Sequence, residues 1–120
     1  MVKLSDTDWK IMELLWDKSP LSTMDIVHAL DETMGWARST VITLLNRMTS
    51  KGLITFKSEN KTKLYYPAID RSQVELEETK SFLQKFYNGN IGFLVSSLIK
   101  QESITEEEME DLRRIIKDGD

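Results

Sequence analysis

Cysteine is missing from this 120-residue sequence, and histidine occurs only once. Without cysteine the chain forms no disulfide, holds no thiolate-bound metal and performs no thiol catalysis, which suits a reducing compartment. A single histidine supplies neither a catalytic triad nor a His-based metal site. Glycine-rich phosphate loops are absent as well. We therefore expect neither an enzyme nor a bound metal or cofactor.

Long apolar runs are also lacking. The first ten residues, MVKLSDTDWK, contain no stretch of signal-peptide length, and no segment approaches the roughly 18 apolar residues that span a bilayer. An apolar content of 40% with 30% charged residues is typical of one or two small folded domains. We therefore expect a cytoplasmic protein with a modest core and no insertion into a membrane.

An excess of positive charge is absent from the chain as a whole, which has a formal charge of −4. Residues 1–70 hold nine basic and nine acidic side chains, whereas residues 71–120 hold seven and eleven. Within the neutral half, a stretch with Glu59 as its single acid contains six basic residues: Arg38, Arg47, Lys51, Lys57, Lys61 and Lys63. A local basic patch of this kind is typical of a surface that binds nucleic acid.

Helix start signals precede the periodic apolar segments of the first half. Ser5 with Asp8, and Ser22 with Asp25, have the spacing of a capping box. A glycine, Gly52, follows the third segment and is typical of a helix end. The apolar spacing predicts three helices, over residues 6–18, 23–32 and 37–51.

After Gly52 the apolar period changes from 3.6 to 2. Ile54 and Phe56 share one face, residues 58–61 form a polar turn, and residues 64–66 continue as a second strand. Three short helices followed by a β-hairpin describe a winged helix-turn-helix, in which the hairpin is the wing. The expected fold is mainly α with a small β-hairpin wing.

The third predicted helix has two distinct sides. A stripe at core spacing consists of Val41, Leu44, Leu45 and Met48. On another side lie Thr40, Thr43 and Arg47, where each threonine can offer its hydroxyl to phosphate and its methyl to thymine. Arg47 lies about 10.5 Å along the axis from Thr40, so it suits phosphate better than the base edges. This second side is the predicted DNA-binding face.

The second half of the chain contains three further predicted helices, over residues 71–87, 91–100 and 106–117. Helices this short are marginal alone and need an apolar partner surface, and a second copy of the chain is the commonest partner. We therefore divide the chain into a DNA-binding domain, residues 1–69, and a C-terminal helical dimerisation domain, residues 70–120. The expected dimer contacts are Phe82, Leu83, Phe86, Leu94, Leu98, Leu112 and Ile116.

The chain resembles the penicillinase and methicillin-resistance repressors (BlaI/MecI type), which share their architecture with copper-responsive CopY-type repressors. The resemblance rests on LSDTDWKIMELLWD, TVITLLNRMTSKGLI, YYPAI, TKSFLQKFYNGNIGFLVSSLIKQE and EEEMEDLRRII, in that order. It implies a homodimeric repressor on a palindromic operator DNA. The positions that match the family's DNA contacts are Ser39, Thr40, Ile42, Thr43, Arg47, Lys61 and Lys63. Ile42 stands where family members frequently carry a basic residue.

The same resemblance implies how repression ends. The family's scissile bond aligns with Ser97-Leu98, and a membrane-bound sensor metalloprotease would be the signalling partner. The paired cysteines of CopY-type metal sensing are missing here. Two other interpretations remain open: a ligand-sensing winged-helix regulator with a small-molecule pocket, and a winged-helix protein-interaction module that does not bind DNA.

Overall fold

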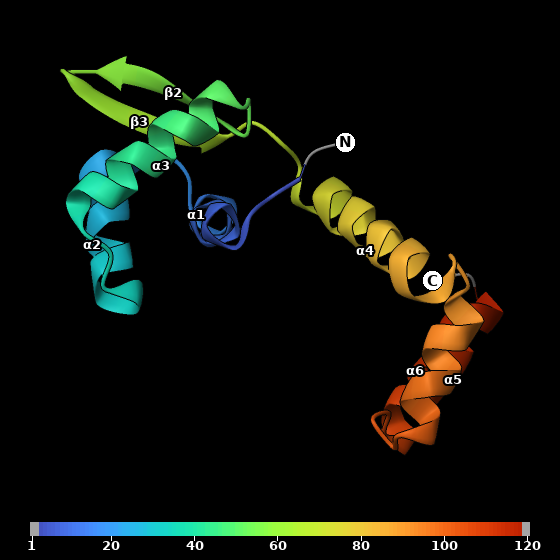
Figure 1. Cartoon of the computed structure of the whole chain (residues 1–120). Coiled ribbons are helices and arrows are strands. Elements are labelled where there is room, and N and C mark those ends of the chain that lie inside the picture. Colours follow the sequence, from blue (N-terminus) through green and yellow to red (C-terminus); the bar gives the residue numbers. More distant parts are fainter. Residues whose placement is uncertain (1–2, 119–120) are drawn as a thin grey trace. The chain divides into compact units, whose positions relative to one another are not determined.

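The computed structural model describes residues 3–118, which form six helices and a small antiparallel sheet (Figure 1). This arrangement confirms a mainly helical fold with a β-hairpin. The elements in order are α1 (Asp6–Asp17), β1 (Leu21–Ser22), α2 (Thr23–Met34), α3 (Arg38–Ser50), β2 (Ile54–Glu59), β3 (Thr62–Pro67), α4 (Arg71–Tyr87), α5 (Ile91–Lys100) and α6 (Glu106–Asp118).

The chain divides into two compact units, of which the first ends at Glu77 and the second begins at Glu78. The division falls inside α4, whereas the sequence analysis divides the chain between residues 69 and 70. The first unit thus contains α1 to α3, the sheet and the first turns of α4.

Reciprocal capping boxes begin the first two helices, as predicted. The backbone N–H of Asp8 donates to Ser5 Oγ, and the N–H of Ser5 donates to Asp8 Oδ2, both at 3.1 Å. Ser22 and Asp25 repeat the pair of bonds at the start of α2. Gly35 then ends α2 with a φ of 67°, in the left-handed region that a residue without a Cβ adopts easily.

The core of the first unit is formed by the apolar stripes of α1, α2 and α3 together with residues at the inner end of the hairpin. All four residues of the α3 stripe are buried, which confirms the predicted packing side of this helix. The cluster consists of Ile11, Met12, Leu15, Ile26, Val27, Leu30, Val41, Leu44, Leu45, Met48, Leu53, Ile54 and Tyr65. Helix α3 is thereby fixed with its opposite side outward.

The hairpin is tighter than predicted. Glu59 pairs with Thr62, so the turn consists of two residues, Asn60 and Lys61, rather than four. Both have positive φ, 50° and 66°, which gives a two-residue turn whose twist matches that of the flanking strands. The strands therefore continue almost to the tip and carry Lys61 at the end of the wing.

A third strand, β1, was not predicted. It comprises two residues, too few to show a period, and pairs with β3 through Leu21 opposite Tyr65 and Ser22 opposite Leu64. The strand order is β1-β3-β2. Because Ser22 also caps α2, this pairing attaches the start of α2 to the side of the wing.

The start of α4 is fastened to α1. The indole N–H of Trp16 donates to the Ile69 carbonyl at 3.0 Å, and the Arg71 guanidinium lies 5.6 Å from the centre of the Trp16 ring. Trp9 contacts the same ring edge-on, with ring centres 5.5 Å apart. Val74 is buried. These contacts explain why the first turns of α4 belong to the first unit.

The second unit consists of the rest of α4 with α5 and α6, whose bounds match the predicted helices to within one residue. Thr105 and Glu108 form a third capping box at the start of α6. No helix within residues 3–118 is both long enough and apolar enough to cross a membrane. The same residues contain no group of three His, Asp or Glu side chains placed to hold a metal ion.

Candidate nucleic-acid interface

Helix α3 turns its predicted DNA-binding face outward. Because its buried stripe is packed on the core, the side chains of Ser39, Thr40, Thr43 and Arg47 are exposed, and Ile42 is half-buried at the edge of this face. The structure therefore brings together on one helix the five α3 residues that the sequence analysis named. The face is polar and short-chained over its first two turns, which permits close approach to a groove.

The two threonines of this face are not equivalent. Thr43 Oγ1 donates its proton to the Ser39 carbonyl of the preceding turn at 2.9 Å. A hydroxyl has one proton to donate, so Thr43 Oγ1 can still accept a hydrogen bond from DNA but cannot donate one to a phosphate oxygen. For Thr40 the described residues offer no such bond. The chemistry expected of both threonines is therefore available mainly at Thr40.

The wing carries exposed lysines whose ammonium groups lie over aromatic rings. Lys63 Nζ lies 4.5 Å from the centre of the Phe56 ring, and Lys57 Nζ lies 5.5 Å from the centre of the Tyr66 ring. Each contact joins β2 to β3, so the rings hold the charges to the hairpin by cation–π attraction. Lys61 is at the tip. The wing thus presents positive charge along its length.

A cleft of about 360 Å³ lies between the wing and the starts of α2 and α3. It is lined by Ser22, Thr23, Met24, Arg38, Lys61, Thr62 and Lys63. Three cations and three serine or threonine side chains line this cleft, beside the N-terminus of α2, a combination that suits a phosphate group. Arg38 belongs to the basic patch of the sequence but is not among the predicted contact residues.

At the other end of α3, two cations lie against a buried carboxylate. Arg47 Nη2 is 3.6 Å from Asp8 Oδ1, and Lys51 Nζ is 3.6 Å from Asp8 Oδ2. Burial raises the pKa of Asp8, but hydrogen bonds from Ser5 and the charges of Lys51 and Arg47 outweigh that effect. The pKa of Asp8 therefore lies below its ordinary value, and the group is ionised at neutral pH. The capping pattern of Ser5 and Asp8 predicts neither of these two contacts, which join segments far apart in the sequence.

The residues expected to form a dimer lie in the second unit and are largely uncovered. Phe82, Phe86, Leu98 and Ile116 are exposed, Ile116 by 80%. The other three, Leu83, Leu94 and Leu112, are half-buried. Helices α5 and α6, which lie wholly within the described residues, contribute no buried side chain. The expected cleavage position, Ser97-Leu98, lies inside α5.

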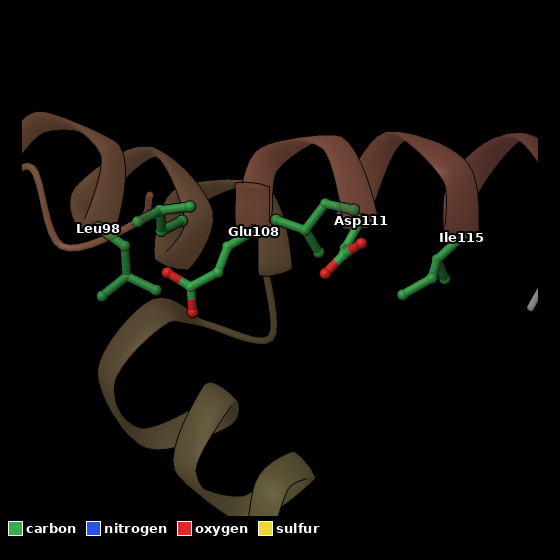
Figure 2. A pocket seen from close by; sticks show the side chains of 6 residues that line it. Leu98, Glu108, Asp111 and Ile115 are labelled. Atoms are coloured by element: carbon green, nitrogen blue, oxygen red, sulfur yellow. The ribbon is translucent and has the colours of Figure 1, made fainter. Parts of the chain in front are cut away.

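A shallow, mostly apolar pocket of about 320 Å³ lies between α5 and α6 (Figure 2). Leu98 comes from α5, and Glu108, Asp111 and Ile115 come from α6, with their side chains directed to the same space. Ile104 and Leu112 complete the lining. The pocket thus combines apolar walls with two carboxylates.

Comparison with known proteins relates this architecture to repressors. The penicillinase repressor family model matches residues 4–118. The methicillin resistance regulatory protein MecI of Staphylococcus aureus is 30% identical over 114 residues, which cover 95% of this chain and 93% of MecI. The penicillinase repressor of Bacillus licheniformis is 28% identical over 116 residues, covering 97% of this chain and 91% of that protein.

Two solved structures share the fold. The DNA-binding domain of the repressor BlaI superimposes with a TM-score of 0.55 at 30% identity, covering 58% of this chain and 85% of that domain. Monomeric Bacillus licheniformis BlaI in complex with the blaP half-operator gives 0.54 at 30% identity, covering 59% and 87%. These matches confirm the predicted winged helix. The chain belongs to the penicillinase repressor family, whose members are transcriptional repressors with DNA-binding domains and not enzymes.

Proposed function

We propose that this protein is a homodimeric transcriptional repressor that binds a palindromic operator DNA in the cytoplasm and controls β-lactam resistance genes. The printed names of its relatives and the half-operator complex of one of them support this role. The observation that carries it is the outward face of α3 beside a wing and cleft where cations converge. Cations can bind the phosphates of DNA, while the short side chains of α3 can approach the edges of the bases.

The proposed contacts divide into two kinds. Ser39, Thr40, Ile42 and Thr43, in the first two turns of α3, would lie against base edges in the major groove. Arg47, near the end of α3, would bind phosphate. In the wing, Lys61 and Lys63 would bind the adjacent backbone, together with Arg38 across the cleft. This division predicts that the first group determines sequence preference and the second mainly affinity.

Dimerisation is proposed for the second unit because its apolar side chains are uncovered in a single chain. Covering Phe82, Phe86, Leu98 and Ile116, together with the half-buried Leu83, Leu94 and Leu112, would remove a large apolar area from water. Each such side chain contributes roughly 1.5–3 kcal/mol when fully buried, before the entropy cost of association. A second copy of the chain presents the same apolar surface, so a symmetric dimer is the simplest assembly that covers these side chains.

Release by proteolysis at Ser97-Leu98, or by a partner signal, completes the proposal. The bond lies in α5, so a protease can cleave it only after this helix unfolds locally. Opening costs little in a single chain, where α5 buries no side chain, and more in a dimer that covers it. A membrane-bound sensor metalloprotease remains the proposed partner for this step.

A salt titration tests the DNA-binding proposal. Duplexes enriched from a random-sequence pool by the full chain supply the operator probe, and a shuffled duplex supplies the control. If a dimer neutralises about six to eight phosphates, the slope of log K against log salt is roughly −5 to −7. A slope shallower than about −2, or no enriched duplex, would contradict the proposal and favour the protein-interaction module.

The pocket between α5 and α6 supports a second candidate, a small-molecule-sensing repressor. Its volume of about 320 Å³ is at the low end for ligand sites, and an apolar amine fits its lining if it pairs with Asp111 in place of Arg114. A panel of such amines tests it by melting temperature. A saturable rise that is lost in Asp111→Asn would support ligand sensing, whereas no shift would leave release to proteolysis or a partner.

A further inference from the structure

Asp8, a fully buried carboxylate outside the proposed reading face, joins α1 to the end of the DNA-binding helix. Its two oxygens lie 3.6 Å from Arg47 Nη2 and from Lys51 Nζ, respectively. The two cations are one helical turn apart at the end of α3, and each keeps nearly half of its side-chain surface exposed. Their inner sides therefore meet one anion while their outer sides meet solvent.

The capping role of Asp8 does not account for this arrangement. Asp25 makes the same two capping bonds at the start of α2, yet no described Lys or Arg lies within ion-pair distance of it. In Asp8, Oδ2 accepts the Ser5 N–H, whereas buried Oδ1 receives no hydrogen bond from the described residues. An oxygen buried in this way is costly, and the charge of Arg47 offsets the cost.

We propose that Asp8 is a positioning residue for specific DNA binding, an inference that rests on the proposed function. Asp8 holds Arg47 and Lys51 against the first unit, so that their outward N–H groups meet phosphates while the first turns of α3 meet the bases. It thereby raises preference for operator DNA over random DNA rather than affinity for DNA in general.

The donor geometry explains how one anion can hold the cations without occupying them. A guanidinium has five N–H donors and an ammonium has three, so a contact on one side leaves donors for a phosphate on the other. Side chains held before binding lose less freedom on binding. In a specific complex the phosphates lie at fixed places relative to α3, so held cations are favoured. On random DNA, mobile cations find phosphates equally well.

The test uses the full chain with Asp8→Asn, which keeps the size of the side chain and its capping bonds but removes its charge. The matched control is Asp25→Asn, which changes the same box position and the same net charge in α2. Binding is measured to the enriched and the shuffled duplex. We expect Asp8→Asn to weaken the enriched complex about threefold to tenfold per half-site, from the ordering cost of freed side chains, without weakening the shuffled one. Asp25→Asn should change both complexes by the same factor.

A second background separates positioning from general stability. In the double variant Arg47→Met/Lys51→Met the positioned cations are gone, so adding Asp8→Asn should not lower the preference further. Asp8→Asn should also lower the melting temperature of the wild-type chain but raise that of the double variant, where Asp8 is a buried anion without a cation to pair with. The comparison in the double variant remains informative even if Asp8→Asn destabilises the wild-type chain.

The outcomes are distinct. A wild-type chain that enriches no duplex would overturn the proposed function and this inference with it. If the wild type shows preference and Asp8→Asn keeps it, or if Asp8→Asn and Asp25→Asn act alike, the positioning role alone is overturned. An equal loss of preference from Asp8→Asn in both backgrounds would also overturn it, because Asp8 would then act by another route.

Discussion

In the first unit, α1, α2 and α3 bury their apolar stripes against one another and against the hairpin, whereas α5 and α6 of the second unit bury no side chain within the described residues. The two units also differ in the side chains that they expose. The outward side of α3 and the wing carry threonines and cations, whereas most of the large exposed apolar side chains, such as Phe86 and Ile116, lie in the second unit. An apolar stripe in a sequence therefore indicates burial without saying whether the covering surface comes from the same chain.

This difference places DNA binding and the proposed dimerisation in separate parts of the chain. The first unit holds its DNA-binding face on a core of its own and should fold without the second. The second unit gains its apolar contacts only when another surface covers it. Variants that affect one unit and spare the other are the direct way to test this contrast.

The largest effect is expected from removing the second half of the second unit. A chain ending at Ser97 loses Leu98, Ile99 and all of α6, so it should be monomeric while its circular dichroism keeps the helices and strands of the first unit. Binding to a palindromic duplex should weaken by up to about 10²–10⁴, because two linked half-sites become two separate events. Sedimentation and gel-shift series measure both. A truncated chain that remains a tight dimer would contradict the assignment of residues 70–120.

A pair of leucine truncations sharpens the comparison. Leu45, 1% exposed in the core of the first unit, should cost about 2–5 kcal/mol of unfolding free energy when changed to alanine. Leu112→Ala, on half-buried α6, should instead weaken the dimer and leave the unfolding of the first unit unchanged. Urea unfolding of the full chain, followed by the emission of the first unit's tryptophans, and sedimentation of the full chain separate the two. Equal effects of both changes on unfolding would mean that the units share one core.

A smaller effect is expected on the DNA-binding face. Thr40→Val should reduce preference for the enriched duplex, because it removes the hydroxyl that the structure leaves available. Thr43→Val keeps a methyl group and loses a hydroxyl whose proton is already given to the Ser39 carbonyl, so only an acceptor is lost and the effect should be smaller than that of Thr40→Val. Fluorescence anisotropy on both duplexes measures this. A larger loss for Thr43→Val would show that its hydroxyl turns outward on DNA.

The smallest effect is an acid dependence of stability. The pKa of Asp8 is depressed in the folded chain, so its contribution is present at neutral pH and is lost as pH falls through the ordinary aspartate range toward the folded value. The melting temperature of Asp8→Asn should therefore lie below that of the wild type at pH 7, and the gap should shrink as pH falls below about 4. A gap that does not change with pH would mean that charge plays no part.

Local patterns predicted most of the fold. The helix starts follow from capping pairs such as Ser5 and Asp8, and the outward side of α3 follows from the spacing of its apolar residues. Strand β1 was missed because its two residues pair with β3, far along the chain. The predicted turn, residues 58–61, is longer than the observed turn of Asn60 and Lys61, because no sequence signal indicates a positive φ at lysine.

The sequence predicts which residues lie on the outward side of α3, but it does not predict the contacts that segments far apart in the chain make at the candidate site. Arg38 belongs to the cleft because β1 and the wing approach the start of α3, and no periodicity reports that approach. The pairing of Asp8 with Arg47 and Lys51 depends on how α1 packs against α3. The internal bond of Thr43 is a choice of rotamer, which a sequence does not record. Each of these features belongs to tertiary packing.

The tryptophans give the two units different optical properties. Trp9, Trp16 and Trp36 all precede Glu78, and the Trp16 indole is bonded to the Ile69 carbonyl where α4 begins. Emission from the unlabelled chain therefore reports on the first unit and its junction with α4, and it carries no direct signal from α5 or α6. When a dimer separates, scattered light should fall while emission stays constant. When the first unit unfolds, the emission should shift to the red, so one sample distinguishes dissociation from unfolding.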